Sequence, residues 1–301
     1  MLKIFSGNSN KPLAQKIAQK LSLDLSPLEI TVFSDGEKRI RVIDSVVSQD
    51  CAVVQSTSSP VDTNYMELFF IVDALKRSGA KSITAVVPYL GYQRQDHVFR
   101  DGEAVSLDVV IKNLEGLGVS KVITLDLHSI KIPELFSIPV AHLSALPIFA
   151  ERIKQMVNGK WSMVNCCLVS PDMGGIRRIK ILSEMLGDMP YVTIDKNRDL
   201  ETGEVTSSEI NGKVLKHAII VDDMISTGKT IVAATNLLIE KGAEDVVVLS
   251  THAVFSRGCR ELLQDSVVSK VIVTDSIEIP KEKQFPKLEV LSIADIIAGE
   301  L

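Results

Sequence analysis

The sequence predicts an α/β protein of two domains, and three observations carry that prediction. Segments typical of strands alternate with helical patterns along the chain, which favours parallel α/β layers. A length of 301 residues is enough for two domains of ordinary size. Residues 52–89 and 218–254 each run strand, polar loop, helix, strand, as two copies of one unit would. We expect each domain to be a mainly parallel sheet flanked by helices.

Composition and charge narrow the class of protein further. Apolar residues make up 46% of the chain and can fill large cores, while a net charge of −5 argues against a nucleic-acid partner. The chain has no apolar run of membrane-spanning length, and Met1–Asn10 turns polar too soon for a signal peptide. We therefore expect a cytoplasmic protein with no membrane partner.

The small-residue stretch at 141–147, AHLSALP, marks the expected join between domains covering residues 1–143 and 144–301. The cysteines lack C-x-x-C spacing and lie in or beside apolar strand patterns, so reduced core thiols are expected. They are Cys51, Cys166, Cys167 and Cys259.

The segment Ala218–Thr230, AIIVDDMISTGKT, contains the most informative motif. An apolar strand leads to Asp222 and Asp223, and then to a hydroxyl- and glycine-rich turn before a helix. Such a turn directs backbone N–H groups at a phosphate on the helix N-terminus, and carboxylates beside it can accept hydrogen bonds from sugar hydroxyls. A nucleotide P-loop needs a glycine where Asp223 stands, so a sugar phosphate is the expected ligand. The other reading is an ordinary turn with a solvated acid pair.

The first copy of the unit lacks these features. Gln55 and Ser56 stand where the acid pair stands in the second copy, and Pro60 interrupts the equivalent turn. Sugar-phosphate binding is therefore expected in the second copy alone.

Two polar segments of the N-terminal half are further candidates for a ligand site. VFSDGEKRIRV, residues 32–42, places Ser34–Gly36 as a turn between two extended stretches, and an ordinary hairpin would explain it equally well. Residues 90–106 follow a strand and carry Arg94, His97 and Arg100, which suits either a ligand at the sheet edge or a solvated loop.

Other expected strands are followed by residues that could bind a metal ion or supply positive charge to a ligand. Residues 121–129 indicate a strand that ends Asp126-Leu127-His128, and period-two alternation puts Asp126 and His128 on the same side. Asp172 precedes paired glycines and is a second candidate ligand for a shared Mg²⁺. Residues 195–209 predict a loop or hairpin over a site, in which Lys196 and Arg198 could point the same way or face solvent.

Taken together, FSDGE, GYQRQD, DLH, VSPDMGG, DKNR and VDDMISTGKT resemble the ribose-phosphate pyrophosphokinase family in order and approximate spacing. That resemblance implies two tandem type I phosphoribosyltransferase-like domains. It also implies Mg²⁺-dependent transfer of the pyrophosphoryl group of ATP to the 1-hydroxyl of ribose 5-phosphate, releasing AMP. Members form dimer-based homo-oligomers that extend to tetramers or hexamers.

The resemblance also implies a role for each matching residue. Lys196 and Arg198 would be catalytic, and His128 and Asp172 would bind the metal. The ATP-binding residues would be Phe33, Asp35, Gly36, Glu37, Arg94 and Gln95. The ribose 5-phosphate-binding residues would be Arg198, Asp222, Asp223, Ser226, Thr227, Gly228, Lys229 and Thr230.

The chain departs from the commonest bacterial pattern at two places. Asn197 and the segment Asp199-Leu200-Glu201 replace a basic run, and Lys229 stands where small residues are usual. Lys229 either adds a cation to the 5-phosphate or points away. The competing functions are a phosphoribosyltransferase that consumes phosphoribosyl pyrophosphate and a catalytically silent homologue.

Overall fold

A computed structural model describes residues 1–159, 161–198 and 205–301, and the chain forms two compact units. The first unit comprises Met1–Ser144, Asp275–Glu278 and Ser292–Leu301, and the second comprises Ala145–Thr274 and Ile279–Leu291. Neither unit is one continuous stretch of chain. The predicted boundary after residue 143 lies one residue before the chain first passes from the first unit to the second. The prediction did not include the return of residues 275–278 and 292–301 to the first unit.

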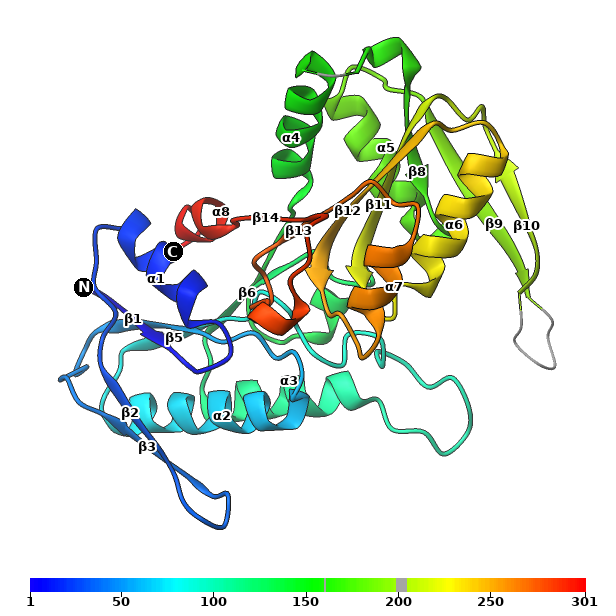
Figure 1. Ribbon diagram of the computed structural model, residues 1–301. Helices are drawn as coiled ribbons and strands as arrows, with labels where there is room; N and C mark the ends of the chain where they lie inside the picture. Colours follow the sequence, from blue (N-terminus) through cyan, green and yellow to red (C-terminus); the bar gives the residue numbers. More distant parts are fainter. Residues whose placement is uncertain (160, 199–204) are drawn as a thin grey trace. The chain divides into compact units, whose positions relative to one another are not determined.

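A five-stranded parallel sheet in the order β1-β4-β5-β6-β7 forms the centre of the first unit. A two-stranded antiparallel ribbon, β2-β3, extends beside it (Figure 1). The strands are β1 (Leu2–Ser6), β2 (Leu28–Val32), β3 (Lys38–Val42), β4 (Asp50–Val54), β5 (Ser82–Val86), β6 (Lys121–Leu125) and β7 (Val140–Leu143). The helices are α1 (Lys11–Lys20), α2 (Val61–Arg77), α3 (Ser106–Leu117), the short η1 (Ile132–Leu135) and α8 (Ala294–Ala298).

Helices cover both faces of this first sheet. α2 and α3 bury Leu68, Ile71 and Ile111 against one face, as their apolar spacing of three and four residues requires. The last helix, α8, packs on α1. The Lys121 ammonium lies 2.5 Å from the Glu300 carboxylate, which attaches the end of the chain to β6.

The second unit contains a seven-stranded sheet in the order β10-β9-β8-β11-β12-β13-β14. All neighbours are parallel except β10, which pairs antiparallel with β9 at the edge. The strands are β8 (Cys166–Ser170), β9 (Tyr191–Arg198), β10 (Val205–Asn211), β11 (His217–Ile225), β12 (Asp245–Ala253), β13 (Lys270–Thr274) and β14 (Leu288–Leu291). The helices are α4 (Leu146–Gly159), α5 (Ile176–Met185), α6 (Lys229–Glu240), α7 (Cys259–Asp265) and the short η2 (Met163–Asn165), η3 (Met173–Gly175) and η4 (Lys281–Lys283).

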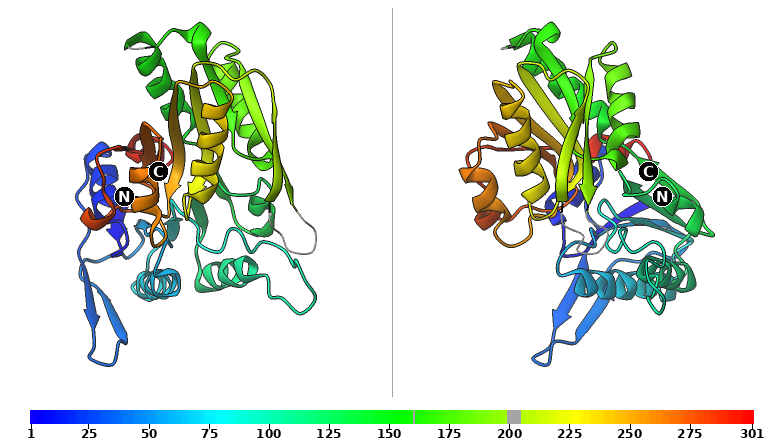
Figure 2. Two further views of the ribbon diagram at one scale, coloured as in Figure 1. Left: turned by 45° about the vertical axis from the view of Figure 1, so that its right-hand side comes forward. Right: turned by 90° about the vertical axis from the view of Figure 1, so that its right-hand side faces the viewer.

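Alternating strand residues build two cores, one on each face of this sheet. Val169 and Ile220 pack with α6 and α7, whereas Leu168 and Ile219 pack with α4 and α5. Figure 2 shows these helix pairs on opposite sides of the strands. The predicted fold class, two α/β domains with mainly parallel sheets flanked by helices, is confirmed.

All four cysteines are free and buried, as the sequence predicts. Burial raises the pKa of the Cys51 and Cys166 thiols to about 11 and that of Cys259 to about 12. These thiols therefore stay protonated and unreactive near neutral pH. No helix among the described residues is long and apolar enough to cross a membrane.

Candidate active site

The acid pair of the second unit lies near the carboxyl end of β11. This strand continues past the pair to Ile225, so Asp222 still pairs in register with Ser250 of β12. The Arg178 guanidinium, from α5, lies 3.7 Å from Asp222 Oδ1 and 3.9 Å from Asp223 Oδ1. One cation from a neighbouring helix therefore faces both carboxylates, and sequence reasoning missed it.

Burial and crowding of negative charge determine the protonation of the pair. Burial raises the pKa of Asp222 well above the ordinary value for an aspartate, and the Asp223 carboxylate adds to the effect. Arg178 lowers that pKa, while Asp172 raises it slightly. The raised pKa means that Asp222 gains from a bound proton, a nearby cation or a hydroxyl donor, which suits a ligand that brings such groups.

The turn after β11 leads directly into α6 and is open to solvent. Gly228 adopts a left-handed φ of +78°, and a Cβ there would lie 3.1 Å from Cys259 Sγ, so only glycine fits without strain. No side chain caps the N-terminus of α6 in the described chain, and Thr227, Lys229 and Thr230 are exposed. The Lys229 N–H donates only a long hydrogen bond, of 3.4 Å, to Thr227 Oγ1. A helix start without a side-chain cap favours an anion.

A second loop supports this turn. The Ser226 and Ser256 hydroxyls lie 2.9 Å apart, and the Ser256 N–H donates to the Ser226 carbonyl at 2.9 Å. Ser256 follows β12, so the carboxyl ends of two neighbouring parallel strands are joined at the edge where ligands of such sheets bind.

The paired glycines after Asp172 allow a tight approach between strand and helix. A Cβ on Gly175 would lie 2.4 Å from Ser170 Oγ, so a side chain at this position would force the turn apart. The exposed Asp172 accepts a hydrogen bond from the Gly175 N–H at 3.2 Å. Because α5 begins directly after these glycines, Arg178 in its first turn lies beside the acid pair.

The equivalent turn of the first unit is closed by its own hydrogen bonds. Gln55, Ser56 and Thr57 are fully buried. The Ser56 hydroxyl donates to the Ser276 carbonyl, and the Thr57 hydroxyl donates to that of Tyr89. This satisfied turn contrasts with the open one before α6.

The predicted hairpin in the N-terminal half is present, with β2 and β3 joined by residues 33–37. The Phe33 N–H donates to the Glu37 carbonyl at 2.8 Å, and the whole tip is exposed. The Arg39 guanidinium lies 5.6 Å from the centre of the Phe33 ring. A cavity of about 460 Å³ lies between the hairpin and α2. It is lined by Gly36, Glu37, Lys38, Asp62, Thr63, Met66 and Phe70.

The other predicted residues of the first unit lie on loops at the carboxyl ends of β5 and β6. Arg94, Gln95 and His128 are exposed. The His128 N–H donates to Oε1 of Gln93 at 2.9 Å, so the buried Gln93 joins these two loops. The predicted alternation of Asp126 and His128 is wrong, because β6 ends at Leu125 and Asp126 turns inward with a φ of +32°.

The predicted catalytic residues Lys196 and Arg198 lie in β9, opposite Ser208 and Val205 of β10. Residues 195–209 therefore include a hairpin, one of the two forms predicted. The side chains of Lys196 and Arg198, and the segment Asp199-Leu200-Glu201, lie outside what the structure describes.

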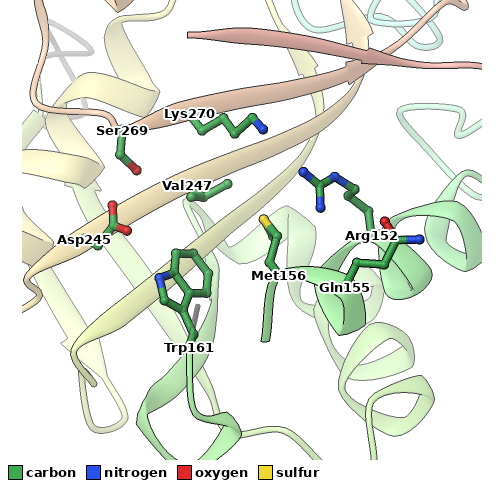
Figure 3. A pocket seen from close by; sticks show the side chains of 8 residues that line it. All are labelled: Arg152, Gln155, Met156, Trp161, Asp245, Val247, Ser269 and Lys270. Carbon is green, nitrogen blue, oxygen red and sulfur yellow. The ribbon is translucent and has the colours of Figure 1, made fainter. Parts of the chain in front are cut away.

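In the second unit, a cavity of about 330 Å³ lies at the opposite edge of the sheet from the acid pair, where β12 and β13 begin (Figure 3). Its cations Arg152 and Lys270 are both paired with Glu289, and the Arg152 Nε lies 2.6 Å from the Glu289 carboxylate.

 Because parallel sheets bind their ligands at the carboxyl ends of the strands, this cavity is not part of the candidate active site.

The metal-binding prediction concerns residues of both units. Within the described residues, no three His, Cys, Asp or Glu side chains form a group that could hold a metal ion. His128 lies in the first unit and Asp172 in the second, so a shared ion stays a prediction. Carboxylate oxygens, the donors that a hard cation prefers, are nevertheless present beside the acid pair, where Asp172 lies close enough to raise the pKa of Asp222.

Comparisons with known proteins agree with this architecture. Residues 2–118 match the N-terminal domain of ribose phosphate pyrophosphokinase, and residues 196–301 match the phosphoribosyl synthetase-associated domain. A ribose-phosphate pyrophosphokinase of Fusobacterium nucleatum is 41% identical, with 100% of this chain and 94% of that protein covered. The one from Bacillus subtilis is 39% identical, with 99% and 92% covered.

A solved structure supports the same assignment. The crystal structure of phosphoribosylpyrophosphate synthetase from Mycobacterium smegmatis superposes with a TM-score of 0.92 at 35% identity, covering 99% of this chain and 97% of that one. The fold and site thus define an α/β enzyme with tandem phosphoribosyltransferase-like domains. The chain belongs to the ribose-phosphate pyrophosphokinase family.

Proposed function

We propose that this enzyme makes phosphoribosyl pyrophosphate by transferring the pyrophosphoryl group of ATP to the 1-hydroxyl of ribose 5-phosphate, with release of AMP. The observation that carries the proposal is the acid pair beside the uncapped N-terminus of α6. The helix start suits a phosphate, and the carboxylates suit the hydroxyls of its sugar. Family membership supports the direction of the reaction.

In this proposal the second unit holds ribose 5-phosphate. The backbone N–H groups and hydroxyls of Ser226–Thr230 take the 5-phosphate, while Asp222 and Asp223 accept hydrogen bonds from ring hydroxyls. Arg178 keeps both acids oriented and limits their mutual repulsion. Arg198 binds near the sugar and the transferring group.

The first unit holds ATP. Phe33 stacks on the adenine, and Asp35, Gly36 and Glu37 contact the nucleotide from the exposed hairpin tip, together with Arg94 and Gln95. The hairpin of one copy serves the site of its neighbour, so the working form is a dimer-based homo-oligomer. Exposure of the whole hairpin tip supports an arrangement in which another molecule covers it.

The chemical step exchanges one phosphorus–oxygen bond for another. The 1-oxygen of the sugar forms a bond to the β-phosphorus, and the bond from that phosphorus to the oxygen bridging the α- and β-phosphates breaks. The electron pair leaves with AMP, and the hydroxyl proton is released. Lys196 and Arg198 stabilise the charge that develops on the moving oxygens.

His128 and Asp172 would hold Mg²⁺, which when bound would supply positive charge to offset the phosphate charges. The chain's own side chains align the two substrates, because such transfers depend mainly on positioning and on stabilisation of charge.

The test is AMP release from ATP, with and without ribose 5-phosphate, in the presence of Mg²⁺. We expect AMP only with the sugar phosphate, and one equivalent of phosphoribosyl pyrophosphate by ³¹P NMR. Asp222→Asn should raise KM for ribose 5-phosphate, whereas the exposed Asp265→Asn in the same unit is the matched control. Absence of ribose-dependent AMP would contradict the proposal and favour a silent homologue; consumption of phosphoribosyl pyrophosphate with a base would favour a phosphoribosyltransferase.

A further inference from the structure

Glu67 is a buried carboxylate that the proposed reaction does not use. It lies on the inward face of α2 with 1% of its surface exposed. Its Oε1 accepts hydrogen bonds from the Asn8 N–H at 2.6 Å and from Gln55 Nε2 at 3.1 Å, and its Oε2 accepts one from Asn8 Nδ2 at 3.0 Å. A charge that is buried this deeply persists only when partners compensate for its lost hydration.

The cation that compensates Glu67 comes from the hairpin. Lys38 Nζ lies 2.5 Å from Glu67 Oε2, and the lysine side chain is only 14% exposed. Burial alone would raise the pKa of Glu67, but the hydrogen bonds from Lys38 and Asn8 and the charge of Lys38 together lower it. The Glu67 carboxylate is therefore ionised at neutral pH and forms a close ion pair with Lys38.

The acceptor end of this pair is rigidly held. Gln55 Oε1 accepts hydrogen bonds from the Ser9 N–H at 3.1 Å and the Ser9 hydroxyl at 2.8 Å. A Cβ on Gly7 would lie 2.2 Å from Gln55 Oε1, so the backbone at Gly7 packs directly against the Gln55 side chain. Glu67 is thus fixed to the loop after β1 and to the end of β4.

The donor end lies at the base of the hairpin tip. Lys38 is the first residue of β3, paired with Val32 and directly after Glu37. The tip has its own short-range bonds, from the Phe33 N–H to the Glu37 carbonyl and from the Glu37 N–H to Asp35 Oδ1 at 3.1 Å. Its internal shape is therefore set locally, while its position against α2 depends on the residues at its base.

We propose that Lys38 and Glu67 form a buried clamp that positions the hairpin tip for nucleotide binding, with Lys38 as a positioning residue and not a phosphate ligand. This inference rests on the proposed function, in which residues 33–37 bind ATP. The clamp holds one wall of the cavity between the hairpin and α2, where Gly36 and Glu37 face Met66 and Phe70. Because the ammonium is committed to Glu67, its charge is not offered to a phosphate.

The test compares Lys38→Met with Lys112→Met, which removes the same charge from an exposed pair, Lys112–Asp108, in the same unit. We expect Lys38→Met to raise KM for ATP about tenfold through misplacement of the tip, with KM for ribose 5-phosphate unchanged. Lys112→Met should leave both constants unchanged, and Lys38→Arg should restore most of the ATP affinity. An unchanged KM for ATP in Lys38→Met, or an equal rise in both constants, overturns the clamp.

A double-mutant cycle separates positioning from direct contact with the nucleotide. If the clamp is correct, Glu67→Gln weakens ATP binding as Lys38→Met does, and the double variant is no worse than either single one. If Lys38 instead binds a phosphate, freeing it by Glu67→Gln leaves ATP affinity intact or improves it, and the proposal fails. Calorimetry with a non-hydrolysable ATP analogue gives the affinity, and thermal melting shows which variants are folded.

The two levels of inference fail separately. A wild-type enzyme that releases no ribose-dependent AMP contradicts the proposed function whatever Lys38 does. A wild-type enzyme that releases AMP, combined with a Lys38→Met variant of normal ATP affinity, contradicts the clamp alone.

Discussion

Arg178 is a cation that lies beside both carboxylates of the acid pair. Its side chain is 16% exposed, so the interaction with Asp222 and Asp223 is little screened by solvent. A sequence signal existed, because arginine follows the paired glycines of VSPDMGGIRR at a helix start. Nothing in the spacing said that this helix faces β11, and for that reason the residue was missed.

Replacing Arg178 by methionine should raise KM for ribose 5-phosphate about tenfold, because two crowded carboxylates lose their shared cation and orientation. Steady-state kinetics with each substrate varied in turn would measure this. Arg177→Met, at the exposed neighbouring position on the same helix, is the control and should behave as wild type. A rise confined to KM for ATP would show that Arg178 serves another purpose.

Lys196→Ala should lower kcat about 10³-fold, because a cation that stabilises transferring phosphoryl oxygens can contribute that much. The melting temperature should change little, since the sequence around Lys196 is polar. Turnover and thermal melting of the variant are compared with those of Lys213→Ala, an exposed lysine in the same unit. A near-normal rate would make Lys196 an ordinary surface charge.

At the scale of elements, the turn between β11 and α6 has a left-handed backbone conformation at the proposed phosphate site. Gly228 has a left-handed φ and no space for a Cβ beside Cys259, whereas Gly242, after the same helix, has a φ of +99° and nothing within 4 Å. Replacing each glycine by alanine would therefore distinguish two losses of stability. Gly242→Ala loses stability through its left-handed conformation alone, and Gly228→Ala through that conformation and a close contact with Cys259.

Gly228→Ala should lose stability by about 1–2 kcal/mol from the left-handed conformation alone, and more from contact with Cys259. It should also weaken binding of ribose 5-phosphate, because the N–H groups at the start of α6 shift. Gly242→Ala should show only the conformational loss, with unchanged kinetics. Denaturant unfolding and KM for the sugar phosphate provide the comparison, and equal kinetics in both variants would separate this turn from the ligand.

The elements that sequence predicted best are those with a local signal. The β11 turn, the start of α6 and the hairpin of residues 33–37 follow from strand patterns, turn residues and glycine. The failures involve tertiary contacts: the path of Asp126 depends on where β6 stops, and the burial of Glu67 depends on Lys38 reaching it from a distant hairpin. A carboxylate on the apolar face of α2, between Tyr65 and Leu68, was the available hint.

At the scale of the whole molecule, each unit carries an acid-sensitive ion pair. In the second unit, a hydrogen bond from Arg152 and a weaker one from Lys270 lower the pKa of Glu289 to about 2. In the first unit, Lys38 and Asn8 lower the pKa of Glu67. A carboxylate with a lowered folded-state pKa stabilises the protein above its unfolded pKa, about 4.3 for glutamate. That contribution is lost as pH falls through the folded-state value.

We therefore expect the contribution of these two glutamates to the melting temperature to change little between neutral pH and about pH 5, and to fall progressively below about pH 4.3. Glu289→Gln should lower the melting temperature at neutral pH, and its difference from wild type should shrink as pH falls toward 2, because Glu289 itself then takes up a proton. Differential scanning calorimetry across this range is the measurement. Glu240→Gln, an exposed site in the same unit, is the control, and a pH-independent difference for Glu289→Gln would contradict the assignment.

The return of residues 275–278 and 292–301 to the first unit has a consequence for how the protein is made. Asp275 binds the Lys16 ammonium at 2.8 Å and accepts from the Ile293 N–H at 2.9 Å, so the first unit uses residues that are synthesised after most of the second. Domains of most chains fold in the order of their synthesis. Here the first unit to begin cannot be completed until residues 292–301 have been made, whereas the second has all of its residues once Leu291 has emerged.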